Sequence, residues 1–206
     1  MPNKFSVEKQ FHCPQCGYTL SLYFTHTKLV QCESCKSTIF LEDETAQVWG
    51  DSSVLAPEIS ILKCNTPFFY KQKTYLPLGK IRYSYGRGLW EEWWVKDTQN
   101  NEYWLSIDEG DLVLQQKVDV TYPDTFFDRL RLGLITSDGW VVSELGEAKC
   151  EGFEGSLPKK INIGSTYAYA HLSGKDAQLR TLELTEGKLE AYEGVWISPF
   201  DIGRVS

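Results

Sequence analysis

Apolar and polar side chains alternate along most of the chain after residue 58. In the stretch KIRYSY, Ile81, Tyr83 and Tyr85 fall on one face of an extended strand, and Arg82 and Ser84 fall on the other. A period of two is typical of a half-buried β-strand. Turn signals rich in Gly, Asp and Asn interrupt the pattern about every ten residues, which indicates a meander of antiparallel strands.

The pattern predicts an all-β protein with about ten to twelve strands. Residues 121–129 are a modest helix candidate, one or two turns at most. Residues 41–58 are acidic and poorly periodic, so we interpret them as the end of an N-terminal unit followed by a linker. We expect a small unit in residues 1–50 and an antiparallel β-barrel or β-sandwich domain in residues 51–206.

Four of the seven tryptophans lie in one short stretch, WEEWWVKDTQNNEYWL, which spans residues 90–105. Alternation places Trp90, Glu92 and Trp94 on one face of the first strand and Trp93 on the other. A strand with large rings on both faces is usually packed on both faces, as in a barrel or sandwich. We therefore interpret most of these rings as core.

A second interpretation is an aromatic surface that binds a ligand. Its candidate residues are Trp90, Glu92, Trp94 and Trp104. Several carboxylates surround them in the sequence, and both aromatic faces and carboxylates attract positive charge. This interpretation predicts a small cationic ligand, such as a polyamine, or a lysine-rich peptide.

The six cysteines divide into four near the N-terminus and two elsewhere. Cys13, Cys16, Cys32 and Cys35 form two CxxC pairs separated by fifteen residues. Each pair lies on one tight turn and presents two sulfurs, so two turns supply a tetrahedron. The spacing predicts a zinc ribbon with a structural Zn²⁺ ion. Iron in a four-cysteine site and a redox-active dithiol are the alternatives.

Charge is distributed unevenly along the chain. Residues 1–40 contain four lysines and two glutamates, a balance of +2, whereas the chain as a whole carries −7. An acidic main part does not suit a nucleic-acid backbone. We expect a protein partner instead, contacted mainly through the basic N-terminal unit.

The sequence contains no apolar run of the length that spans a bilayer. The N-terminal stretch MPNKFSVEKQFHC has no apolar core of the kind found in a signal peptide. A cytoplasmic location is therefore expected.

Nucleotide-binding, serine-hydrolase and zinc-protease motifs do not occur, and we assign no catalytic residue. Cys64 and Cys150 are interpreted as small buried hydrophobes. A hydrolase-like enzyme that uses His171 with acidic residues is a further alternative. The favoured interpretation is a non-enzymatic binding module or assembly adaptor.

Several motifs resemble a bacterial family known as domain of unknown function 4178. They include Trp90-Glu91-Glu92-Trp93, Trp104-Leu105-Ser106, the acidic turn at residues 108–110 and Tyr192-Glu193-Gly194. Ser156 departs from the family pattern within residues 154–158. The resemblance covers roughly residues 53–206 of the chain.

The resemblance implies that a zinc ribbon precedes the family domain, and it assigns no catalytic residue. It also implies an accessory role in an envelope- or stress-associated bacterial system, because such domains tend to be encoded near membrane proteins and polyamine-synthase-like enzymes. A membrane-associated protein partner is expected on this basis.

Overall fold

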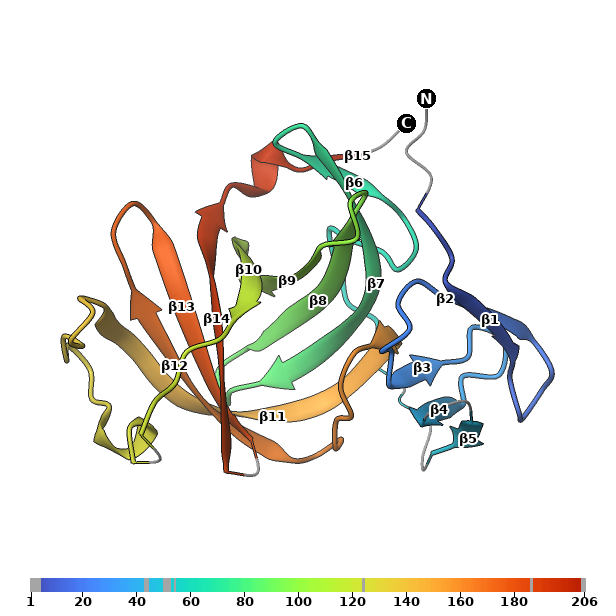
Figure 1. Ribbon diagram of the computed structural model, residues 1–206, viewed down its shortest axis with the longest axis horizontal. Coiled ribbons are helices and arrows are strands. Elements are labelled where there is room, and N and C mark those ends of the chain that lie inside the picture. Colours follow the sequence, from blue (N-terminus) through green and yellow to red (C-terminus); the bar gives the residue numbers. More distant parts are fainter. Residues whose placement is uncertain are drawn as a thin grey trace.

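Eight antiparallel strands close into a β-barrel in the computed structural model (Figure 1). The structure describes residues 5–42, 45–49, 53, 55–123, 125–185 and 187–204. The barrel strands, in spatial order, are β7 (Lys73–Ser84), β8 (Leu89–Asp97), β9 (Glu102–Asp108), β10 (Asp111–Val118), β14 (Lys188–Ile197), β13 (Gln178–Thr185), β12 (Thr166–Ser173) and β11 (Val141–Leu157). β11 pairs back with β7, and this pairing closes the barrel.

Closure depends on glycines where two strands approach closely. Gly79 on β7 faces Gly155 on β11, and a Cβ at Gly79 would collide with the backbone of Ser156. The register also shifts between Pro77 and Gly79, which bends β7. Irregularities and glycines of this kind allow long strands to curve around a barrel.

The outer face of the barrel carries two apolar patches, and other segments cover both. Trp93, Val95 and Leu105 pack beneath Phe68 and Tyr70, which belong to the segment that precedes β7 and includes β6 (Phe68–Tyr70). β6 also pairs with the C-terminal β15 (Gly203–Arg204).

The second outer patch lies on β11 to β14 and is covered by the connection between β10 and β11. Leu172 and Leu182 pack there against Trp140 and Phe126. Burial of apolar groups on the outer face leaves the inner face free to carry polar residues.

The structure confirms the predicted all-β class, and its architecture is the barrel rather than the sandwich. The helix expected within residues 121–129 is a 3-10 turn, η1 (Phe127–Arg129), and a second such turn is η2 (Pro199–Asp201). Within residues 41–58, strand β5 (Thr45–Val48) pairs with β4 and forms the end of the N-terminal unit. Among the residues described, no helix has the length and apolar character needed to cross a membrane.

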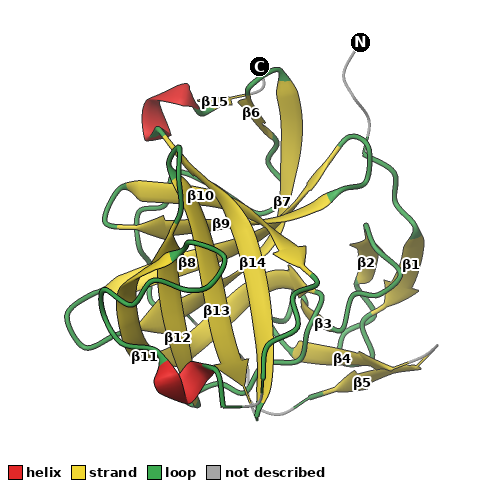
Figure 2. Ribbon diagram, turned by 60° about the vertical axis from the view of Figure 1, so that its left-hand side comes forward, coloured by secondary structure: helices red, strands yellow, loops and turns green. Residues whose placement is uncertain are grey.

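The N-terminal unit consists of two hairpin-like sheets beside the barrel (Figures 1 and 2). β1 (Lys9–His12) pairs with β2 (Thr19–Leu22), and β3 (Leu29–Gln31) pairs with β4 (Thr38–Glu42). β3 also pairs with β11 through Leu29 and Val30, so the sheet of this unit continues into the barrel sheet. The predicted domain division between residues 50 and 51 lies outside the described residues and stays a prediction.

The loop between β2 and β3 covers one end of the barrel, here called the ribbon end. The ring of Phe24 lies 5.1 Å from that of Trp94. Lys96 donates a hydrogen bond to the carbonyl oxygen of Tyr23 at 2.9 Å, and His26 lies 3.0 Å from Glu102. The opposite end of the barrel is here called the far end. It contains the start of β8, the end of β9 with Asp108, and the part of β11 around Glu144, which pairs with β12.

Candidate functional site

The four N-terminal cysteines lie together, as their spacing predicted. Their sulfur atoms are all within 4.8 Å of one another. Sγ of Cys13 lies 3.7 Å from that of Cys35, and Sγ of Cys16 lies 3.7 Å from that of Cys32. Four sulfurs at about 2.3 Å from one ion would be about 3.8 Å apart at the corners of a tetrahedron. The donor set and its spacing therefore fit one metal ion.

Two equivalent turns place these sulfurs. Cys13 follows β1 and Cys32 follows β3, so each CxxC turn begins where a strand ends. Gly17 donates its backbone N–H to the carbonyl of Cys13 at 2.8 Å, and Lys36 donates to that of Cys32 at 2.9 Å. Both Gly17 (φ 76°) and Lys36 (φ 62°) adopt the left-handed backbone conformation.

The barrel interior contains a second candidate site, a cavity of about 20 Å³ here called the lumen cavity. Five strands contribute to its walls. Some of these strands are not neighbours in the sheet but face each other across the barrel, because the rings of Trp90 on β8 and Tyr169 on β12 lie 5.1 Å apart. A cavity of this size holds about one water molecule. Its lining residues include Tyr83, Trp90, Glu92, Tyr169, His171 and Glu183.

Glu92 is the most perturbed carboxyl group of the lumen cavity. Burial, followed by the charge of Glu183, raises the pKa of Glu92 to about 8. Its carboxylate accepts a hydrogen bond from Nε1 of Trp90 at 3.4 Å. Lys159 is the cation that acts on Glu92, but it bonds to Glu183 instead. Glu92 is therefore a buried acid whose surroundings are too negative for its charged form.

Lys159 lies between the lumen and a larger pocket at the ribbon end. Its Nζ lies 2.9 Å from Oε2 of Glu183 and above the rings of Trp104 and Tyr192, at 5.4 and 5.8 Å from their centroids. Burial is the largest single effect and disfavours the ammonium, but the charges of Glu183, Tyr192, Tyr83 and Glu92 together outweigh it and raise the pKa of Lys159 well above its usual range. Lys159 is a cation held by one carboxylate and two rings.

The pocket at the ribbon end, here called the end pocket, has a volume of about 680 Å³. This volume lies in the range of pockets that hold small molecules. Its walls come from the N-terminal unit, the β8–β9 turn, β10, β14 and the loop after β11. Its lining residues are His26, Asn100, Asn101, Glu102, Trp104, Gln116, Lys117, Pro158, Lys159, Lys188, Glu190 and Tyr192.

At the far end, His171 is oriented by a carboxylate. Its Nδ1 lies 2.9 Å from Oε2 of Glu144, and the hydroxyl of Tyr169 donates to Oε1 of the same residue at 2.8 Å. The hydrogen bond to His171 is the main reason that the pKa of Glu144 is lowered. Burial, with added repulsion from neighbouring carboxylates, raises the pKa of nearby Asp108. The far end is therefore acidic.

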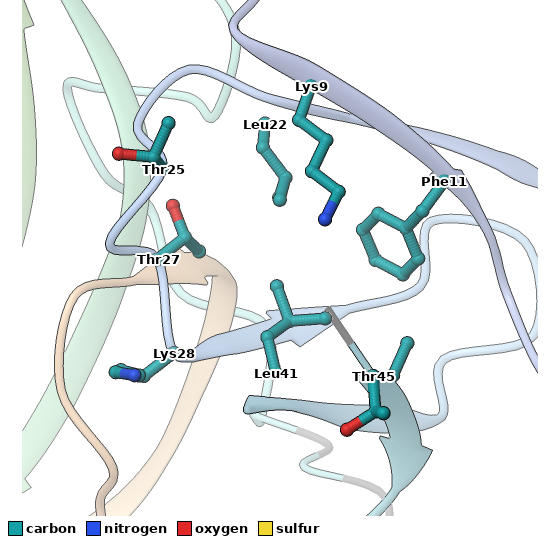
Figure 3. A pocket seen from close by; sticks show the side chains of 9 residues that line it. Lys9, Phe11, Leu22, Thr25, Thr27, Lys28, Leu41 and Thr45 are labelled. Carbon is teal, nitrogen blue, oxygen red and sulfur yellow. The ribbon is translucent and has the colours of Figure 1, made fainter. Parts of the chain in front are cut away.

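A further hollow of about 210 Å³ lies within the N-terminal unit itself (Figure 3). Phe11, Leu22 and Leu41 form its apolar part, while Lys9 and several threonines lie around them. The described residues that line it include no carboxylate, and it is separate from the barrel interior.

The predicted ligand residues occupy three different environments. Trp90 and Glu92 line the lumen cavity, and Trp104 lines the end pocket. Trp94 is fully buried beneath Phe24 and donates its Nε1 to Glu102 at 3.0 Å. That these residues bind a ligand stays a prediction.

Sequence reasoning missed the residues that complete the site. Glu183 follows Thr181 with a spacing of two in the strand LRTLEL, so alternation alone placed both on the face opposite Leu182. A polar face opposite an apolar one was the available signal, but it is usually assigned to solvent. Lys159 carried no local signal, because its role depends on a contact with Glu183 on a distant strand. Tyr192 belongs to one of the family motifs, but its contact with Lys159 could not be foreseen from the sequence.

Comparison with known proteins gives one match. A family model described as "Domain of unknown function (DUF4178)" matches residues 66–199, which include all eight barrel strands in full. No curated protein and no solved structure matches the chain.

Proposed function

The chain belongs to the DUF4178 family, whose description names no activity, and from the geometry of the barrel we propose that it binds a small organic cation inside the barrel. The ligand would place an ammonium group beside Glu92 and Glu183, with aromatic rings around it. The observation that carries this proposal is that two carboxylates, Glu92 and Glu183, line one cavity with several aromatic rings, while the neighbouring Lys159 pairs with Glu183 alone.

The charge balance of the lumen favours a cation. With Glu92 and Glu183 ionised, Lys159 neutralises one of two negative charges. A cation that entered the lumen would stabilise the ionised form of Glu92 and so lower its pKa. Small barrels are usually filled by apolar side chains, so a lumen with several ionisable groups indicates a function beyond packing.

The walls of the lumen also suit a cation. Tyr83, Trp90 and Tyr169 form a continuous aromatic wall, with the ring of Trp90 at 5.2 Å from Tyr83 and 5.1 Å from Tyr169. Ring faces attract ammonium groups, and more strongly where water is excluded. The same lumen shows this chemistry already, because Lys159 lies over Trp104 and Tyr192.

Titration with n-butylamine tests the proposal, with spermidine as the comparison for a ligand that carries more than one positive charge. Calorimetry at pH 8 should show saturable binding together with proton release, because the bound cation lowers the pKa of Glu92. Proton release is measured by repeating the titration in buffers of different ionisation enthalpy.

The Glu92→Gln variant keeps the shape of the side chain and removes its charge. It should weaken amine binding at least about tenfold, the equivalent of about 1.4 kcal/mol, and abolish the proton release. The matched control is Glu147→Gln, which changes an exposed carboxylate on β11. Equal binding by the wild type and Glu92→Gln would refute the proposal.

We also propose that the ion held by the four cysteines is Zn²⁺. The support is the closed set of four sulfurs with the spacing of a tetrahedral site. Metal analysis of protein purified without added metal should give one zinc per chain. Iron with the visible absorption of a four-thiolate site, or two disulfides and no metal, would contradict it.

The pairing of His171 with Glu144 supports a second candidate function, acid–base catalysis. A carboxylate that orients an imidazole is a common arrangement for a general base, and His171 lines the same cavity as Glu92. Incubation with a metabolite extract, followed by mass spectrometry, should show a product with the wild type that is absent with His171→Gln. Identical product profiles would count against catalysis.

The adaptor role stays a prediction from the sequence, and ligand binding does not exclude it. The exposed Tyr18 beside the second metal-site cysteine offers a test in the full chain. If the N-terminal unit contacts a protein partner, Tyr18→Ala should reduce co-purification of that partner from the native cell, while the exposed control Leu132→Ala should not.

A further inference from the structure

We propose that the cage around Lys159 is the ammonium-binding subsite of the barrel, and that Lys159 occupies it as a built-in competitor which an alkylammonium ligand displaces. The inference rests on the proposed binding of an organic cation. It adds the position of the ammonium group, the route by which it enters and the residue that opposes it.

The cage has the chemistry of an ammonium site. One carboxylate, Glu183, lies 2.9 Å from Nζ, and the rings of Trp104 and Tyr192 lie beneath the same atom. The side chains of Lys159 and Glu183 are 28 % and 14 % exposed. A partly desolvated carboxylate with two ring faces is the arrangement by which proteins recognise alkylammonium groups.

The lysine side chain can leave the cage without a large movement of the backbone. Lys159 belongs to the loop between β11, which ends at Leu157, and β12, which begins at Thr166. Leu157 is fixed by the hydrogen bond that its carbonyl accepts from Lys28, and Ile161 is buried. Lys160, next in the chain, lies over the ring of Trp49 at 3.5 Å.

The end pocket provides both the exit for Lys159 and the entry for the ligand. Lys159 lines this pocket of about 680 Å³, whereas Glu183 lines the lumen cavity, so the lysine side chain separates the two spaces. Rotation of its flexible four-carbon stem into the end pocket would expose Glu183 to a ligand there. The ligand then takes the place of the lysine ammonium beside Glu183, while Lys159 stays charged in the adjoining end pocket, so the total positive charge near the two carboxylates increases.

The walls of the end pocket restrict the remainder of the ligand. Lys117 and Lys188 both lie close to one carboxylate, Glu190, at 2.7 and 3.3 Å. A second ammonium on the ligand would meet these lysines, and like charges repel. The subsite therefore favours a primary amine with one positive charge and a neutral or acidic tail.

Removal of the competitor should tighten binding. If the side chain of Lys159 leaves the cage for about a tenth of the time or less, the wild type binds an amine about tenfold or more weakly than a chain with an empty cage. Lys159→Ala creates that empty cage in the full chain. The probe is n-butylamine, which corresponds to the complete lysine side chain, with n-butanol and butyrate as control compounds.

Calorimetry and tryptophan fluorescence should show n-butylamine binding to Lys159→Ala at least about tenfold more tightly than to the wild type. The control variant Lys160→Ala should behave as the wild type. Lys159→Met, which refills the cage without a charge, should show no gain. Circular dichroism checks that each variant is folded, and Lys159→Gln replaces Lys159→Ala if the latter does not fold.

Three results would overturn the inference: equal or weaker amine binding by Lys159→Ala, equal tightening by Lys159→Met, or equal binding of n-butanol. These outcomes differ from failure of the proposed function. If the wild type binds n-butylamine through Glu92 but Lys159→Ala gives no gain, the cation site stands and the competitor is refuted. If neither the wild type nor Lys159→Ala binds an amine, both proposals fail.

Discussion

Glu92 should make the protein less stable as pH rises, and Glu92→Gln should remove this dependence. The pKa of Glu92 is about 8 in the folded chain and about 4.3 for an unperturbed glutamate. Between these values the folded state retains a proton that the unfolded state has lost. Stability from this group is therefore fully present below about pH 4 and declines until about pH 8.

The magnitude follows from the size of the shift. Each pH unit between the two pKa values lowers the free energy of unfolding by about 1.4 kcal/mol, so the upper limit is about 5 kcal/mol. The side chain of Glu92 is only partly buried, and residual exposure screens its charge. We therefore expect a loss of about 2–4 kcal/mol between pH 5 and pH 8.5.

Urea denaturation from pH 5 to pH 8.5 measures the effect in the wild type and Glu92→Gln. Both proteins keep the other groups that surround position 92, namely Tyr83, Lys159, His171 and Glu183. The difference between the two curves therefore isolates the titration of Glu92. The variant should match the wild type at pH 5 and exceed its stability at pH 8.5, while Glu147→Gln should follow the wild type throughout. Parallel curves for the wild type and Glu92→Gln would refute the reasoning.

Three further changes test the fold and the metal centre. Trp93→Ala removes a ring that is 1 % exposed. It should lower the free energy of unfolding, measured by urea denaturation, by about 3–5 kcal/mol. A loss under about 1 kcal/mol would contradict the role of Trp93 in the outer core. Gly79→Ala should lower the thermal midpoint sharply, because its Cβ meets the backbone of Ser156 where β7 joins β11, and an unchanged midpoint would show that the seam adapts. Cys32→Ser should lose the bound metal, as measured by elemental analysis. Its tryptophan emission should also shift, because Phe24 on the adjoining loop covers Trp94. Retention of a full equivalent of metal would contradict a four-cysteine site.

Local features of the chain were predictable from the sequence. The two CxxC pairs are spaced so that each forms its own turn, and a tetrahedral site needs little other information. The faces of β7 and β8 were also predictable, because Tyr83, Trp90 and Glu92 follow strict alternation. Trp93 falls on the opposite face and is packed in the core.

Long-range features were not predictable, because they depend on register between distant strands. Alternation cannot distinguish a barrel from a sandwich, and the pairing of Gly79 with Gly155 decides between them. The pKa of Glu92 depends on Glu183, which lies on β13. Strand β5 was not predicted within the N-terminal unit, because its short sequence TAQV has little apolar character and its order depends on pairing with β4.

The pairing of β3 with β11 has a practical consequence for the design of truncated proteins. Deletion of residues 1–50 would remove the strand that pairs with Ser156 and Leu157, leaving an unpaired edge where β11 leaves the barrel. Unpaired edges recruit strands from other chains. A barrel expressed alone should therefore self-associate, because the N-terminal unit would no longer cover this edge of β11.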